Sequence, residues 1–284
     1  MKERGLKFHD EQTAIGELRV ISYFRFANYL RYFEIRNSGH RFKPDCYFED
    51  ALDLYYFDKR LRALLFTVIQ SVEIAFRSKI IHHVALRHGA FWFADGSLCL
   101  NRAKFQENLS VIKKEVQRSK EDFIQEHFQK YSLPDVPPVW KTLEVTSFGT
   151  LSKLYCNLSD NTVKKRIARD LNLPQHAVLE SWMKCTVVLR NCIAHHARVW
   201  NRRFPQMPQL ALSLRGAWIS NTAVRPNKLY AQLCCLAYLN DSIHPNNDFK
   251  QQLSLLLNIY PKVDLHAMGF PAGWKREPLW RDAF

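Results

Sequence analysis

The sequence predicts an all-α protein. Its 284 residues include only nine glycines, and long runs of the chain contain neither glycine nor proline. No segment shows the alternation of apolar and polar residues that is typical of a half-buried strand. These observations favour a helical bundle over a sheet-containing fold, and we interpret residues 1–284 as a single all-helical domain.

The first half of the chain predicts two short helices followed by a very long helical run. Residues 10–20 and 22–36 are the two short helices. The run from 46 to 88 has no glycine or proline, and it carries apolar residues at three- and four-residue steps, as a core-facing stripe does: Phe57, Leu61, Leu65, Val68, Val72 and Phe76. This pattern predicts one very long helix or two abutting helices.

A charged helical stretch follows at 102–130, with a break expected near Ser119. The proline-rich segment 133–138 is the clearest punctuation in the chain, and it suits a linker or a lobe boundary. A helix from about 174 to 202 is expected to carry the most informative motif, with Pro205 and Pro208 beyond its end. The other helices are expected at 151–158, 162–171, 210–219, 228–239 and 247–259, before an irregular tail at 268–284.

The charge balance indicates a polyanionic partner. Lys and Arg total 41 against 27 Asp and Glu, a formal net charge of +14. Nucleic acid is the first candidate for the partner, and a basic surface that serves solubility alone is the alternative. The seven cysteines are scattered without a C-x-x-C pair, and no stretch approaches the roughly 20 apolar residues of a membrane span. We therefore expect a cytoplasmic protein with reduced thiols and no membrane partner.

Residues 189–202, LRNCIAHHARVWNR, combine an arginine, an asparagine and two histidines with helical spacing. Cleavage of an RNA phosphodiester needs this mixture. The 2′-OH must lose a proton, the leaving 5′-oxygen must gain one, and negative charge gathers on the phosphate oxygens in between. Histidine can carry the proton and arginine can hold the charge.

On an ideal helix these residues fall on two stripes. One stripe is mostly apolar and includes His196, which favours a core or interface role for that residue: Trp182, Thr186, Leu189, Ile193, His196 and Trp200. The other is polar and makes His195 the better candidate for chemistry: Lys184, Asn191, His195, Arg198 and Arg202. Asn191, four residues before His195, can orient the imidazole. Arg198, Arg202 and Arg203 are expected to neutralise flanking phosphates.

Arg190 lies five residues before His195, about 140° around an ideal helix, so the two residues do not share a face and meet only if the long guanidinium arm curls toward the imidazole. A two-fold dimer would bring two such pairs to one cleft and would supply both a base and an acid, which predicts a homodimer. Two alternatives remain open. Arg190 can form a buried ion pair with Glu73, which lies beside Arg77 on the long helix. Alternatively, zinc can be held by Cys185, Cys192 and either His195 or His196.

The chain resembles the Abi-like family of bacterial abortive-infection proteins, of the AbiD/AbiF type, within the HEPN superfamily. The mark of that superfamily is an arginine, four to six intervening residues and a histidine, often with a polar residue after the arginine. Arg190, Asn191 and His195 match it. Further blocks that resemble the family extend over nearly the whole chain: 21–25 (ISYFR), 57–62 (FDKRLR), 73–77 (EIAFR), 148–155 (FGTLSKLY) and 268–271 (MGFP). Ser22 departs from the family, which often has glycine there.

The resemblance implies a HEPN-type helical bundle and a metal-independent endoribonuclease that needs no cofactor. It also implies dimerisation around the motif and a role in antiphage defence through RNA cleavage. Arg190, Asn191 and His195 would be its catalytic residues, with His196 as a further candidate and Glu73 and Arg77 in support. The alternative is a non-catalytic protein that holds a structured non-coding RNA, which can also regulate an active enzyme.

Overall fold

The computed structural model describes all 284 residues, and it consists of α-helices, short 3-10 turns and irregular segments. Its β-pairing is limited to three isolated bridges, so the all-α prediction is confirmed. The helices are α1 (Glu11–Ile21), α2 (Tyr23–Leu30), α3 (Phe48–His88), α4 (Arg102–Arg118), α5 (Asp122–Lys130), α6 (Val139–Thr142), α7 (Phe148–Asn157), α8 (Asn161–Arg169), α9 (His176–Ala194), α10 (Leu229–Ile243) and α11 (Phe249–Ile259).

Helix α3 is the spine of the molecule. It is one uninterrupted helix of 41 residues, roughly 60 Å long. Its first turn is fixed by the backbone N–H of Tyr47, which donates to the carboxylate of Asp50 at 3.0 Å. It ends at Gly89, whose φ of 83° most side chains would disfavour. All six residues of the predicted apolar stripe are buried, so the sequence placed the core-facing side of this helix correctly.

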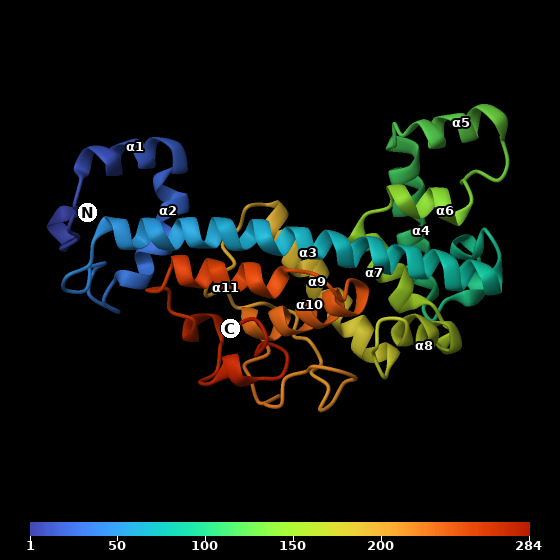
Figure 1. Cartoon of the computed structure of the whole chain (residues 1–284). Helices are drawn as coiled ribbons and strands as arrows, with labels where there is room; N and C mark the ends of the chain where they lie inside the picture. The colour runs from blue at the N-terminus through green and yellow to red at the C-terminus, as the bar shows by residue number, and fades with distance from the viewer.

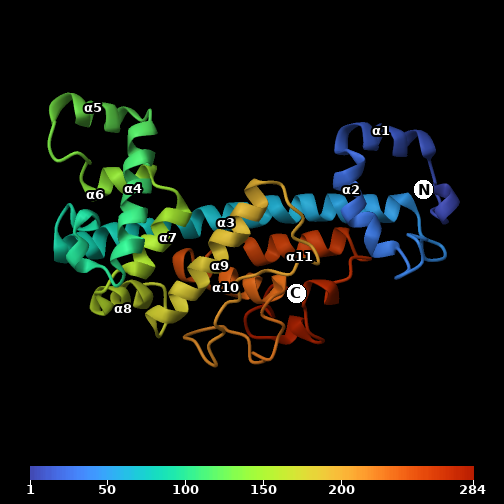
Figure 2. The same cartoon turned by 180° about the vertical axis from the view of Figure 1, so that it is seen from behind.

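The other helices are arranged around α3 as two arms and a base. Helices α1 and α2 stand at one end of α3, and α4, α5 and α6 stand at the other end on the same side (Figure 1). Helices α10 and α11 lie along the opposite side. Helix α9 crosses α3 between the two arms, and its C-terminal end emerges on the side of the arms (Figure 2). The motif therefore lies near the middle of the long axis, flanked by both arms.

The main hydrophobic core joins α3, α7, α9 and α10, and a smaller cluster packs α1 and α2 against the start of α3. In α10 every residue from Leu229 to Asn240 is buried, as expected of a central helix. The C-terminal tail contains only short 3-10 turns, yet Trp274 and Trp280 pack into the core beside Tyr230. No helix combines the length and the apolar composition that a membrane crossing requires.

Outside the motif helix, most helix boundaries follow the predictions, with local differences. The break near Ser119 is confirmed between α4 and α5, whereas α2 is shorter than predicted and ends at Leu30. The helix predicted at 210–219 is absent. Indole N–H groups hold this part of the chain in an irregular path, since Trp182 donates to the carbonyl of Gln209 at 2.8 Å and Trp218 donates to that of Ala211 at 2.9 Å. Trp218 also stacks on Trp182. Tertiary contacts here override a weak local helical pattern.

Candidate active site

The motif helix α9 ends earlier than the sequence predicted. Its last residue is Ala194 rather than a residue near 202, and His195 is the C-cap. The N–H of Ala197 bonds to the carbonyl of Cys192 at 2.8 Å, and the N–H of His196 bonds to that of Ile193 at 2.9 Å. These two bonds form a Schellman motif, the usual way to satisfy the last carbonyls of a helix. The helix stops here, well before the two prolines.

His196 occupies the left-handed position of this motif, with a φ of 55°. Glycine is the usual residue at this position because a Cβ atom costs about 1–2 kcal/mol in left-handed backbone. The conformation is held from outside, since Arg25 of α2 donates to the carbonyl oxygen of His196 at 2.6 Å. Residues held in such strained backbone cluster at functional sites.

The early helix end revises the two predicted stripes. Leu189 and Ile193 lie on the buried face as expected, and Trp200 is fully buried although it lies beyond the helix. His196 is exposed in the chain, so the prediction that it belongs to the core is wrong, and an interface role stays a prediction. His195 is also exposed, and no side chain or backbone group bonds to its imidazole. The imidazole of His195, the histidine favoured for chemistry, therefore has no hydrogen-bond partner within the chain and is open to solvent.

Arg190 lies on the last full turn of α9 and faces α3. Its Nε is 4.0 Å from the Glu73 carboxylate, and its side chain is 37% exposed. Glu73 pairs more closely with Arg77, at 3.0 Å, and Arg77 also donates to the carbonyl of Thr146. The ion pair that the alternative interpretation invoked is thus long and only half-buried. Glu73 therefore pairs with Arg77 at 3.0 Å, and Arg190 lies at the edge of this ion pair.

Asn191 lies closer to Arg190 than to the imidazole. Its Oδ1 accepts from Arg190 Nη1 at 3.5 Å, the outer limit of a hydrogen bond. Its backbone carbonyl accepts the N–H of His195 at 3.0 Å. In this structure the Asn191 amide therefore contacts the arginine, and the histidine is held through the backbone of the same residue.

A buried carboxylate on α3 anchors the loop that follows the histidines. Asp58 is fully buried, and its Oδ1 accepts the backbone N–H groups of Val199 and Trp200 at 3.1 and 2.6 Å. Its Oδ2 accepts from Tyr29 at 2.7 Å and from Arg62 at 2.6 Å. The sequence alone did not predict that Asp58 anchors this loop. The signal was present as an aspartate on the buried side of a long apolar helix, which requires a compensating partner.

The three arginines after the motif have different surroundings. Arg198 donates to the carbonyl of Asn28 at 2.9 Å and lies over the ring of Trp200, and burial lowers its pKa. Arg202 is half-buried and donates to the carbonyl of Arg198. Arg203 is exposed and has no carboxylate partner. Arg203 is the most exposed of the three arginines, and phosphate binding by all three stays a prediction.

A groove of about 650 Å³ opens beside the motif, between α1 and α2 on one side and α3 on the other. We call it the α3 groove. Its residues come from three segments, and it ends at the C-terminus of α9: Val20, Ile21, Arg25, Tyr55, Lys59, Arg62, Ala63, Phe66, Ile193, Ala194 and His196. None of these residues is acidic. The groove joins an exposed histidine to a surface that is apolar in part and otherwise cationic.

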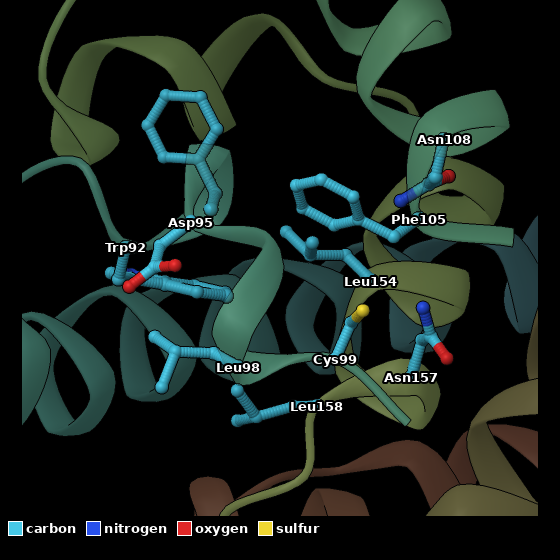
Figure 3. Close-up of a pocket in the computed structure, with 10 residues that line it drawn as sticks. Trp92, Asp95, Leu98, Cys99, Phe105, Asn108, Leu154, Asn157 and Leu158 are labelled. Atoms are coloured by element: carbon cyan, nitrogen blue, oxygen red, sulfur yellow. The ribbon is translucent and has the colours of Figure 1, made fainter. Parts of the chain in front are cut away.

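Two other features of the structure do not form comparable sites. A small pocket beside α4 is lined by Leu98, Cys99, Phe105 and Leu154 among others, and its volume of about 20 Å³ is close to that of a single water site (Figure 3). No group of three or more His, Cys, Asp or Glu side chains comes together as metal ligands. In particular, Cys185 is buried in the core, which raises its pKa to about 12. The zinc alternative therefore lacks its ligand cluster.

Comparison with known proteins gives one family. The model described as Abi-like protein matches residues 17–201, a span that starts in α1 and includes Arg190, Asn191 and His195. No curated protein and no solved structure matches the chain.

Proposed function

The chain belongs to the Abi-like protein family, and we propose that it is a metal-independent endoribonuclease of the HEPN type that acts in antiphage abortive infection by cleaving RNA. The observation that carries this proposal is the exposed, unpartnered imidazole of His195 at the C-terminal end of α9, five residues after Arg190, whose side chain is 37% exposed. A histidine buried in the core would have been out of reach of a polynucleotide. The proposal follows from the accessibility of these two groups together.

The chemistry needs only groups that this chain supplies. His195 takes the proton of the 2′-OH, and the 2′-oxygen attacks phosphorus. The P–O5′ bond breaks and the 5′-oxygen gains a proton, which leaves a 2′,3′-cyclic phosphate and a 5′-OH end. Arg190 stabilises the charge that develops on the phosphate oxygens, and Asn191, in contact with the guanidinium, helps to orient it.

The protonation of the leaving oxygen favours two copies of the site. Each chain has one favoured proton-transfer histidine, His195, and a reaction in which one group accepts a proton while another donates one is served best by two such imidazoles. We therefore propose that a homodimer places the C-terminal ends of two α9 helices at one cleft. Arg203 then contacts a flanking phosphate, with Arg202 and Arg198 adding positive potential.

The test is cleavage of end-labelled RNA by the purified full-length protein in excess EDTA. We expect wild type to cut RNA, to leave 2′,3′-cyclic phosphate ends and to spare an all-deoxy substrate. His195→Ala is expected to lower kcat by about 10²–10⁴-fold and Arg190→Ala by about 10²–10³-fold. His82→Ala is the matched control, because His82 is an exposed histidine that lies on α3, outside the motif.

Two results would contradict the proposal. The first is an unchanged cleavage rate in folded His195→Ala and Arg190→Ala proteins. The second is retention of RNA in an intact complex that wild type never cuts, which would identify a non-catalytic RNA-binding protein. Phage challenge of cells that express wild type or His195→Ala tests the defence role separately, since only the active protein is expected to restrict phage.

A further inference from the structure

We propose that the α3 groove binds the ribonucleotide adjacent to the scissile phosphate and so sets which RNA sequences are cut. This inference rests on the proposed ribonuclease function and adds a subsite to it. The groove reaches the motif, because His196, the neighbour of His195, is one of its lining residues. A nucleotide in the groove would therefore be covalently linked to the phosphate at the imidazole.

The groove has the dimensions of a ligand site. Its α3 wall is formed by residues 55, 59, 62, 63 and 66, which lie on one face of the helix and span roughly 16 Å. Its volume of about 650 Å³ falls within the ~300–1,000 Å³ that is usual for small-molecule pockets. Because α3 is a long rigid helix and α2 is packed against it, this shape does not require a loop to close.

The charge of the groove favours an anion. Arg62 is neutralised by Asp58, with which it forms a buried ion pair at 2.6 Å. Lys59 is exposed and has only the ring of Tyr56 near its ammonium group, and Arg25 uses one nitrogen to hold the carbonyl of His196. Lys59 and Arg25 thus leave positive charge at the groove, and no lining carboxylate balances it. A phosphate bound between Lys59 and Arg25 would lie on the side of the groove that leads to His195.

The apolar residues of the groove favour a nucleobase beside that phosphate. Tyr55 and Phe66 are both half-buried, so part of each ring remains accessible from the groove. Tyr55 is held in place by edge contacts with Tyr29 and Phe26. A base that stacks on the Tyr55 ring adds binding energy that depends on the identity of the base. Lys59 and Arg25, in contrast, bind the phosphate backbone of any RNA sequence. A protein segment is the rival occupant, and the RNA-binding and oligomeric-state measurements distinguish it from a nucleotide.

The test measures binding of a short 2′-O-methyl RNA, which lacks the attacking 2′-OH, to the full chain in a His195→Ala background. Lys59→Ala is expected to weaken binding about threefold to tenfold and to lower the slope of log K against log salt by about one. Ala63→Glu places a carboxylate in the groove at an exposed helical position and is expected to weaken binding about tenfold. Lys114→Ala and Ala103→Glu, on the exposed side of α4, are the matched controls.

Cleavage by the corresponding variants that retain His195 separates the two proposals. We expect Lys59→Ala and Ala63→Glu to raise KM and to change the preferred cut sites, with kcat near that of wild type. If wild type cleaves RNA and the groove variants match their α4 controls in KM, cut sites and RNA binding, this inference is wrong while the ribonuclease stands. If the groove variants change only the oligomeric state, the groove is a protein interface and the inference is equally wrong. If wild type never cleaves RNA, the proposed function itself fails.

Discussion

Replacing the buried anchor Asp58 by asparagine tests how the motif loop is held. In the native structure Oδ1 accepts the N–H groups of Val199 and Trp200, and Oδ2 accepts from the Tyr29 hydroxyl and Arg62. Asparagine keeps one oxygen for the two backbone groups. It presents an NH₂ donor to two other donors and removes the negative charge that balances a guanidinium with 8% side-chain exposure.

The expected loss in the free energy of unfolding follows from leaving the buried guanidinium of Arg62 without its partner. Breaking a buried ion pair by removing one member costs about 3–5 kcal/mol, a large share of the roughly 5–15 kcal/mol that separates folded from unfolded protein. For a chain of this length the midpoint of thermal unfolding should fall by on the order of 10 °C. Urea and thermal unfolding followed by circular dichroism measure both quantities, with Asp53→Asn as the exposed control on the same helix.

The double variant Asp58→Asn, Arg62→Met gives a sharper test. Removing both charges leaves no unpaired ion, so the double variant should be more stable than Asp58→Asn alone, by about 1–3 kcal/mol of coupling. The reasoning is refuted if Asp58→Asn unfolds within 1 kcal/mol of Asp53→Asn, since a spectator carboxylate would behave in that way. It is also refuted if the two losses simply add.

Three further predictions concern backbone strain and pH. Ser22→Gly should raise the free energy of unfolding by about 1 kcal/mol, because Ser22 has a φ of 70° and a ψ of 135° that L-residues rarely adopt. His196→Gly should leave stability equal or up to about 1 kcal/mol higher, whereas His196→Val should lower it by about 1–2 kcal/mol, because a β-branched residue is strained at a φ of 55°. Burial alone would raise the pKa of Asp160, but hydrogen bonds from His88, the first turn of α8 and Arg87 outweigh it and lower that pKa from 3.8 to about 2. Its stabilising contribution is therefore present above about pH 4 and is lost as the pH falls toward 2.

Each of these predictions has a direct measurement and a contradicting result. Denaturant unfolding of Ser22→Gly is compared with that of Ser78→Gly in the exposed face of α3, which should be destabilised by about 0.5–1 kcal/mol, and equal losses would contradict the strain argument. A His196→Gly protein less stable than His196→Val would show that the imidazole, not the backbone, stabilises the turn. Between pH 2 and 5 the free energy of unfolding should change less in Asp160→Asn than in wild type. An equal change in both proteins would show that Asp160 does not contribute to the loss of stability in acid.

The sequence could predict the helices but not every helix end. The long apolar stripe on α3 has a strong 3.6-residue period, so its core-facing residues were readable without a structure. The end of α9 was not readable, because residues 195–202 continue the polarity pattern of a helix and no glycine marks the stop. Arg25, 171 residues away, donates to the carbonyl of His196 just beyond the end of the helix. Propensity rules describe neighbours along the chain and do not include such a contact.

The sequence could name candidate residues for the site but not their contacts, and the catalytic roles of these residues stay predictions. The spacing of the motif selected His195 and Arg190, and the structure leaves both accessible. Helical geometry alone favoured contact between the side chains of Asn191 and His195, whereas the amide of Asn191 lies beside Arg190. The partners of Asp58 were unreadable, because a single sequence does not reveal which distant N–H groups a buried carboxylate accepts.

The motif is not a site that one helix could form alone. Arg25 of α2 holds the carbonyl of His196, and Asp58 and Arg62 of α3 hold the next turn of chain at Ala197 to Trp200. These contacts fix the path of the backbone on the C-terminal side of the catalytic candidate, while its own imidazole stays free. Rigid support around an unoccupied side chain is the arrangement that positions a proton-transfer group, because the cost of ordering the site is met during folding. The N-terminal arm and α3 are therefore part of the candidate active site, although neither carries its Arg-His motif.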